Sequence, residues 1–183
     1  MSGVARLIAF LMPLVLVGCG GGTREPVQLE SEQHNRAHVA PGTNLAEKDF
    51  AATLKSSGAE YVVVSVFAAD CGPCLTEALQ LVDRRDKWHG ERIEVLGLGM
   101  GKTMEEVRRF FKQTGDRANY PLYFAPWFAE QQLVEVTPTI FVFSADGKQL
   151  FRADGTESED LPALVETWFK ETRRKKMAKR SPQ

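Results

Sequence analysis

The 183-residue chain carries a formal net charge of −1, but its charges are unevenly distributed. Seven residues between Lys170 and Arg180 are basic and one is acidic, whereas Cys19 to Phe169 holds 15 basic and 23 acidic residues, a net charge of −8. An acidic body argues against nucleic acid as a partner. The length suits one domain with a full core and requires no second domain.

The N-terminus has the pattern of a secretory signal peptide. Arg6 precedes an apolar run of 11 residues, Leu7 to Val17, and the small residue Gly18 follows. This run is too short to span a bilayer, which takes about 20 apolar residues. A charged start, a short apolar segment and a small-residue cleavage site are instead typical of an export signal. We predict a signal peptide over residues 1–18, whose removal leaves 165 of the 183 residues.

The end of this segment, Leu16-Val17-Gly18-Cys19, resembles a bacterial lipobox, whose cysteine becomes the lipidated first residue of the mature protein. The alternatives are an ordinary cleaved signal and a short helix. The resemblance implies that Cys19 anchors the protein to a lipid bilayer and takes no part in redox chemistry. The expected location is the cell envelope, facing the periplasm or the outer face of the cytoplasmic membrane.

Three further segments follow the signal. Residues 19–44 are polar, contain Gly20-Gly21-Gly22 and Pro41-Gly42, and predict a flexible tether. The folded domain is predicted over residues 45–169, with a basic tail over 170–183. A basic run can hold a protein to an anionic lipid surface, but such runs are more often solvated helix ends.

The first half of the domain alternates helices with strands. Apolar residues at helical spacing predict helices, and continuous apolar runs predict strands buried on both faces. In chain order the segments are a helix over 45–58, a strand over 61–68, a helix with the apolar stripe Leu75, Leu79 and Val82, and a strand over 92–98.

The second half adds a capped helix, a short strand and a hairpin. Thr103 and Glu106 form a capping box, and Asp146-Gly147 is a strong hairpin signal. The segments are a helix over 103–114, a strand over 120–124, a helix over 126–133, strands over 139–145 and 148–153, and an amphipathic helix from about Glu157. Parallel strands crossed by helices, then a hairpin and a final helix, predict an α/β sandwich with a mixed sheet.

The stretch from Leu96 to Thr103, LGLGMGKT, superficially matches a phosphate-binding loop. That pattern requires glycine five residues before Gly101, where this chain has Leu96. Thr103 is already explained as a helix cap, so we expect no nucleotide site.

Cys71-Gly72-Pro73-Cys74 directly follows the first predicted strand and begins a helix. Unpaired backbone N–H groups and the positive end of the helix dipole favour the thiolate of Cys71. Cys74 is one turn further into the helix, so the two sulfurs lie side by side and Cys74 is less exposed. Pro73 suits the first turn and stiffens it. This placement predicts an outer nucleophile and an inner resolving cysteine.

Two other interpretations of the cysteine pair are a metal site and a structural disulfide. A copper or zinc carrier would combine the cysteines with His34, His38 or His89, although a structural zinc site usually needs a second pair of ligands. His34 and His38 fall in the predicted tether, so we expect all three histidines to be solvated and no metal to be bound. A purely structural disulfide would close too small a loop to stabilise the fold much. A redox-active pair is the favoured hypothesis, with the metal carrier as its alternative.

The cysteine motif, together with Thr137-Pro138-Thr139 before the closing hairpin, resembles the thioredoxin superfamily over about residues 45–169. The resemblance implies a thioredoxin-like three-layer α/β/α sandwich with a mixed central sheet. The stretch between Met100 and Leu133 adds a helix-strand insert, which resembles the TlpA/ResA-like branch of exported thiol-disulfide proteins. The resemblance further implies that Pro138 is cis and packs against the sulfurs, and that Thr137 offers backbone hydrogen bonds to substrate.

The sequence departs from the family pattern in three ways. Asp70 stands where the family usually has tryptophan, and its carboxylate disfavours the neighbouring thiolate. Ser65 stands where many members bury an aspartate or similar polar group, and a serine cannot accept a proton at neutral pH. Glu135 or Asp70 could supply that carboxylate instead. Gln132-Leu133 replaces a common Tyr-Gly pair.

The resemblance implies a membrane-tethered thiol-disulfide oxidoreductase that needs no cofactor. The Cys71 thiolate would attack a protein disulfide, and Cys74 would then release the reduced product. Gly72-Pro73 is the pair found in thioredoxin, whose potential is about −270 mV against about −120 mV for the oxidant DsbA. We therefore expect a reductase, supplied with electrons by a membrane partner.

Overall fold

A computed structural model of the protein describes residues 40–155 and 160–180. The predicted signal peptide with Cys19, the two histidines His34 and His38, and the predicted helix start at Glu157 lie outside the described residues. No helix within the two described ranges has both the length and the apolar character needed to cross a membrane.

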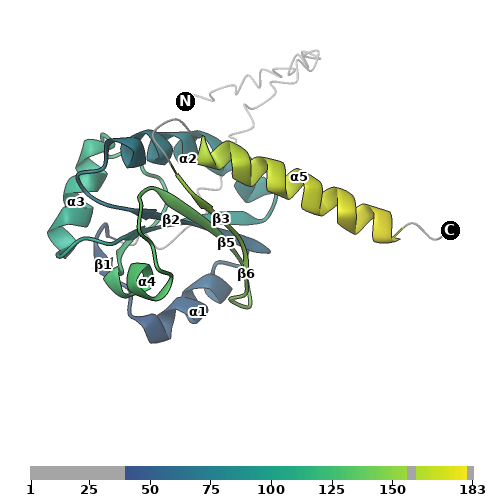
Figure 1. The fold of residues 1–183 in the computed structure, drawn as a ribbon, viewed down its shortest axis with the longest axis horizontal. Helices are drawn as coiled ribbons and strands as arrows, with labels where there is room; N and C mark the ends of the chain where they lie inside the picture. Colours follow the sequence, from purple (N-terminus) through teal and green to yellow (C-terminus); the bar gives the residue numbers. More distant parts are fainter. Residues whose placement is uncertain (1–39, 156–159, 181–183) are drawn as a thin grey trace, which may run out of the picture. The chain divides into compact units, whose positions relative to one another are not determined.

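Six strands form one mixed sheet in the order β1-β4-β3-β2-β5-β6 (Figure 1). Strands β1, β4, β3 and β2 run parallel to one another, whereas β5 runs antiparallel to both of its neighbours, β2 and β6. The hairpin between β5 and β6 turns at Gly147, whose φ of +87° suits glycine. The strands are β1 (Thr43–Asn44), β2 (Tyr61–Phe67), β3 (Ile93–Gly99), β4 (Leu122–Phe124), β5 (Thr139–Ser144) and β6 (Gln149–Asp154).

Five helices cover the sheet on both faces, so the predicted three-layer sandwich with its helix-strand insert is confirmed (Figure 1). Helices α2, α3 and α5 pack on one face, and α1 and α4 pack on the other. Val62 and Val64 of β2 lie in one core and Val63 in the other, because successive strand residues face opposite sides. The helices are α1 (Glu47–Ser56), α2 (Gly72–Gly90), α3 (Met104–Gln113), α4 (Pro126–Gln131) and α5 (Leu161–Arg180).

The fold begins before Leu45, the predicted first residue of the domain. Thr43–Asn44, which the sequence placed in the tether, forms β1 and pairs with β4. The backbone N–H of Gly42 donates to the carbonyl oxygen of Leu122 at 2.9 Å. A segment of two residues is too short to show a hydrophobic pattern from which a strand can be predicted. β1 is a strand because it pairs with β4.

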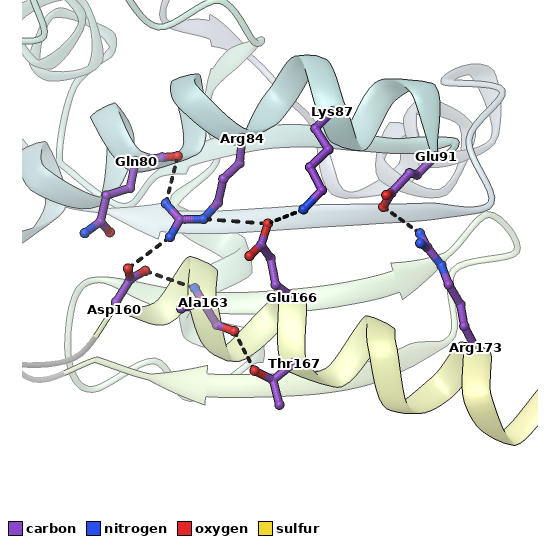
Figure 2. Close-up of polar contacts among 9 residues, drawn as sticks. All are labelled: Gln80, Arg84, Lys87, Glu91, Asp160, Ala163, Glu166, Thr167 and Arg173. Atoms are coloured by element: carbon purple, nitrogen blue, oxygen red, sulfur yellow. Dashed lines mark hydrogen bonds and ion pairs between the residues drawn. The ribbon is translucent and has the colours of Figure 1, made fainter.

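The predicted basic tail is a continuation of α5, which runs as regular helix to Arg180. Arg173 Nη2 lies 2.7 Å from Glu91 Oε2 (Figure 2), and Lys176 Nζ lies 2.5 Å from Glu60 Oε1. The hydrogen bond from Lys176 lowers the pKa of Glu60. The basic run is therefore a helix end that is tied to the acidic body at two points.

The loop that resembles a phosphate-binding sequence holds a carboxylate of its own chain. The backbone N–H of Lys102 donates to Glu106 Oε2 at 2.7 Å, and Thr103 Oγ1 accepts from the Glu106 N–H at 3.3 Å. The predicted helix cap is confirmed. The side chain of Glu106 thus lies directly against this loop, beside Gly101.

Candidate active site

The cysteine pair lies where β2 gives way to α2. Cys71 is the N-cap residue of α2, and its Sγ accepts a hydrogen bond from the backbone N–H of Cys74 at 3.1 Å. The two sulfurs are bonded to each other at 2.06 Å. Cys71 is partly exposed and Cys74 is only 2% exposed. The outer and inner positions expected from the helix are therefore both present.

The loop before β5 reaches the outer sulfur. The Thr137–Pro138 peptide bond is cis, as expected. The carbonyl oxygen of Thr137 lies 3.5 Å from Cys71 Sγ. Two hydrogen bonds fix this loop. The Gly155 N–H donates to the Pro138 carbonyl oxygen at 2.8 Å, and the Thr139 hydroxyl donates to the Val136 carbonyl oxygen at 2.8 Å.

Asp70 and Glu135, the two carboxylates considered for a role in proton transfer, both point to solvent. The side chain of Asp70 is 85% exposed and pairs with Arg109 of α3. Glu135 is exposed as well. Neither carboxylate is therefore buried beside the cysteine pair.

Glu77 is the carboxylate that the sequence analysis missed. It is 4% exposed, and its Oε1 accepts a hydrogen bond of 2.6 Å from Ser65, which is also 4% exposed. Burial raises the pKa of Glu77 to about 8, against the opposing effect of the Ser65 hydrogen bond. Among the described residues, Glu77 Oε2 has no hydrogen-bond partner. The buried carboxyl group that many family members carry at the position of Ser65 is thus supplied here by Glu77 of α2, which is hydrogen-bonded to Ser65.

The predicted stripe on α2 is only partly right, because Leu75 and Val82 pack against the core but the fully buried residues lie elsewhere on the helix. This explains why Glu77 was missed. Leu75, Leu79 and Val82 are only partly buried. The buried face of α2 consists of Cys74, Glu77, Ala78, Leu81, Arg85 and Trp88. These residues also recur at helical spacing, so a lone carboxylate three residues after the second cysteine was the available signal.

A buried tyrosine adjoins the same carboxyl group. Tyr120 is 5% exposed, and burial together with the negative charge of Glu77 raises its pKa. Tyr120 therefore stays protonated across the physiological range. It places a neutral phenol in the core near Glu77.

Within the described ranges, no group of three or more potential ligands is assembled for a metal ion. His89 lies near the far end of α2, and its Nδ1 is 2.5 Å from Glu94 Oε1. His89 is exposed, as expected, and also contacts Glu94. The two remaining histidines of the metal-carrier hypothesis lie outside the described residues.

Comparison with known proteins identifies the fold. No family model and no curated protein matches the sequence. The chain is similar to the structure of a candidate thiol:disulfide interchange protein DsbE from Chlorobium tepidum, with 20% identity and a TM-score of 0.54 over 63% of this chain and 82% of that one. It is also similar to the thioredoxin domain of a thiol-disulfide oxidoreductase from Bacteroides vulgatus, with 18% identity and a TM-score of 0.51 over 63% and 83%.

The domain therefore has the fold of the thioredoxin superfamily. Both of these structural neighbours carry names from thiol-disulfide chemistry, and this chain has a Cys-x-x-Cys pair at disulfide distance.

Proposed function

We propose that the protein is an exported, membrane-tethered thiol-disulfide oxidoreductase that reduces protein disulfides through Cys71 and Cys74. The observation that supports this most directly is the asymmetry of the pair. Cys71 is partly exposed at the start of α2. Cys74 is buried one turn further along the helix, and its sulfur is bonded to the sulfur of Cys71. An exposed nucleophile backed by a shielded thiol is the arrangement that two-step disulfide exchange requires.

In the proposed reaction, the Cys71 thiolate attacks one sulfur of the substrate disulfide. A mixed disulfide forms, and the second substrate sulfur leaves as a thiolate, which takes a proton from water. Cys74 then loses its proton and attacks Cys71 Sγ, which releases the first substrate sulfur. Two electrons pass from the protein to the substrate, and the Cys71–Cys74 disulfide seen in the structure is the product.

We assign Glu77 as the group that accepts the proton of the Cys74 thiol. The two residues are three apart on α2 and share its buried face. A carboxyl group whose pKa of about 8 lies near the working pH can both accept and return a proton. Ser65 holds Oε1 of this group, which leaves the other oxygen for proton exchange.

The cycle needs a partner that returns two electrons to the disulfide form. An envelope location, an anchor at Cys19 and a membrane-embedded electron donor are consistent with one another, because an oxidising compartment supplies no soluble reductant. These parts of the proposal depend on the lipobox-like sequence, since Cys19 lies outside the described residues.

The test is reduction of an insulin-type disulfide by the pre-reduced full chain, with and without added copper or zinc. We expect turnover with dithiothreitol as electron source and a Cys71/Cys74 potential near that of thioredoxin, about −270 mV. A potential near −120 mV would reverse the direction and make the protein an oxidase. Stoichiometric metal binding without any disulfide reduction would instead favour the metal carrier.

A further inference from the structure

One ion pair lies directly beside the proposed nucleophile. Arg109 Nη2 donates to both carboxylate oxygens of Asp70, at 3.0 and 3.2 Å. Asp70 immediately precedes Cys71, whereas Arg109 lies 39 residues further along the chain, on the inserted helix α3. The insert therefore delivers a cation to the loop that carries the reactive sulfur.

A second contact fixes α3 at the same place. The ring of Phe110 stacks on the ring of Phe67 with centroids 4.0 Å apart and an interplanar angle of 21°. Phe67 is the last residue of β2, and Phe110 is 1% exposed. Packing at Phe67, just before the short loop over residues 68–70, and the ion pair at Asp70, its last residue, thus attach α3 at the two ends of this loop.

The other charged side chains in this part of α3 are engaged elsewhere. Arg108 pairs with Glu105 at 3.2 Å, and Glu106 accepts the Lys102 N–H. Arg109 is the cation of α3 that reaches Asp70.

The pair matters through charge more than through stability. An exposed ion pair stabilises a fold by little, and Asp70 and Arg109 are 85% and 49% exposed. A lone carboxylate next to the N-cap of α2 would, however, oppose the helix dipole that favours the Cys71 thiolate. A bound guanidinium cancels most of that opposition.

We propose that Arg109 is a positioning residue for the dithiol: it neutralises Asp70 and holds the 68–70 loop, so that the Cys71 thiolate forms despite the neighbouring carboxylate. The inference rests on the proposed function, in which Cys71 is the attacking sulfur. It assigns to the inserted helix a direct part in the reactivity of the site.

The test measures alkylation of Cys71 by iodoacetamide in the reduced full chain, site by site with mass spectrometry, between pH 5 and 9 at low salt. Through water, one unit charge on the adjacent residue changes the thiolate population by about threefold. We expect Arg109→Gln to slow alkylation by that factor at neutral pH and to move its pH midpoint upward. Arg109→Lys should retain most of the wild-type rate.

Controls separate charge from damage to the fold. Asp70→Asn in the Arg109→Gln background should restore the wild-type rate, and 1 M salt should shrink the defect of Arg109→Gln because exposed charges are screened. Arg108→Gln, the matched change one residue away, should alkylate like wild type.

Equal rates for Arg109→Gln and Arg108→Gln would overturn the inference, as would a failure of Asp70→Asn to restore the rate. If Arg109→Gln does not fold, Arg109→Met, which keeps much of the aliphatic stem and removes the charge, replaces it in the same comparison and must also alkylate more slowly than wild type. Alkylation is read independently of turnover. A chain that reduces no disulfide but shows this pattern refutes the proposed function and retains the role of Arg109.

Discussion

Cys71 and Cys74 lie three residues apart and yet have different surroundings. Cys71 Sγ accepts a hydrogen bond from the Cys74 N–H and lies near the Thr137 carbonyl oxygen. Cys74, in contrast, is almost fully buried by its own helix and the core. The helix end acts on one sulfur, and burial acts on the other. The two cysteines should therefore be unequal in every step of the reaction.

Serine substitutions test this inequality. Cys71→Ser should abolish disulfide reduction, because no sulfur that a substrate can reach remains. Cys74→Ser should retain the first attack and accumulate a mixed disulfide on Cys71. Mass spectrometry after exposure to an oxidised substrate measures both. Comparable adduct formation on Cys74 in the Cys71→Ser protein would contradict the assignment and favour a symmetric metal-binding pair.

Glu77 makes stability depend on pH. Its pKa is about 8 in the folded protein against 4.5 for an ordinary glutamate, so the folded state binds a proton that the unfolded state has released between these values. Stability should be greatest below pH 4.5 for this group and should fall as the pH rises through about 8. Urea midpoints from pH 5 to 9 measure the decline.

Glu77→Gln should flatten this decline, because a neutral amide replaces the titrating carboxyl group. Glu135→Gln, at an exposed carboxylate in the loop before β5, is the matched control for the loss of a surface carboxylate. An unaltered slope in Glu77→Gln would show that another group dominates the pH dependence.

At the scale of elements, the loop before β5 depends on a contact from the end of β6. Gly155 follows β6, is buried, and donates its N–H to the Pro138 carbonyl. A Cβ at this position would lie 2.9 Å from that same oxygen and 2.8 Å from Leu161 Cδ1. The backbone atom cannot move aside without shifting the loop that faces Cys71.

Gly155→Ala should therefore destabilise the protein by about 1–3 kcal/mol, a typical penalty for overpacking, and should slow disulfide reduction. Gly90→Ala is the control, because a Cβ at Gly90 meets no atom within 4 Å. Chemical denaturation and an insulin-reduction assay on both variants give the comparison. Equal stability of the two would mean that the loop has room to adjust.

At the scale of the whole molecule, the basic end of α5 bears on how the protein is attached to a membrane. The acidic body carries its basic counterpart on α5, where Arg173 and Lys176 bind Glu91 and Glu60. Lys170, Arg174, Lys175 and Lys179 are exposed on the same helix end. Two routes to a membrane surface thus exist in principle, the proposed lipid at Cys19 and this cationic helix end.

Cys19→Ser separates the two routes. If Cys19 is lipidated, the variant should leave the membrane fraction or stall in processing, while the reduced domain keeps its thiol activity. Fractionation with a high-salt wash measures this, because salt removes proteins held by charge alone. A variant that stays on membranes and is released by salt would assign the attachment to α5 and contradict the lipoprotein prediction.

Local sequence patterns determined the order of the elements and the position of the cysteine pair. The apolar run at β2, the cap at Thr103 and the Asp146-Gly147 turn each report the backbone within a few residues, and each is confirmed by the structure. A cysteine at a strand-to-helix junction is likewise a local feature. Such signals need no knowledge of what packs against them.

Only the tertiary structure decided which side chains meet. The buried face of α2, and with it the environment of Glu77, depends on the sheet beneath it, because two faces of that helix carry apolar residues. The pairing of Asp70 with Arg109, of β1 with β4, and of the α5 end with Glu60 joins segments that are far apart in sequence. Burial and charge pairing depend on which elements pack together, and the residue periodicity within one element gives no information about its partner.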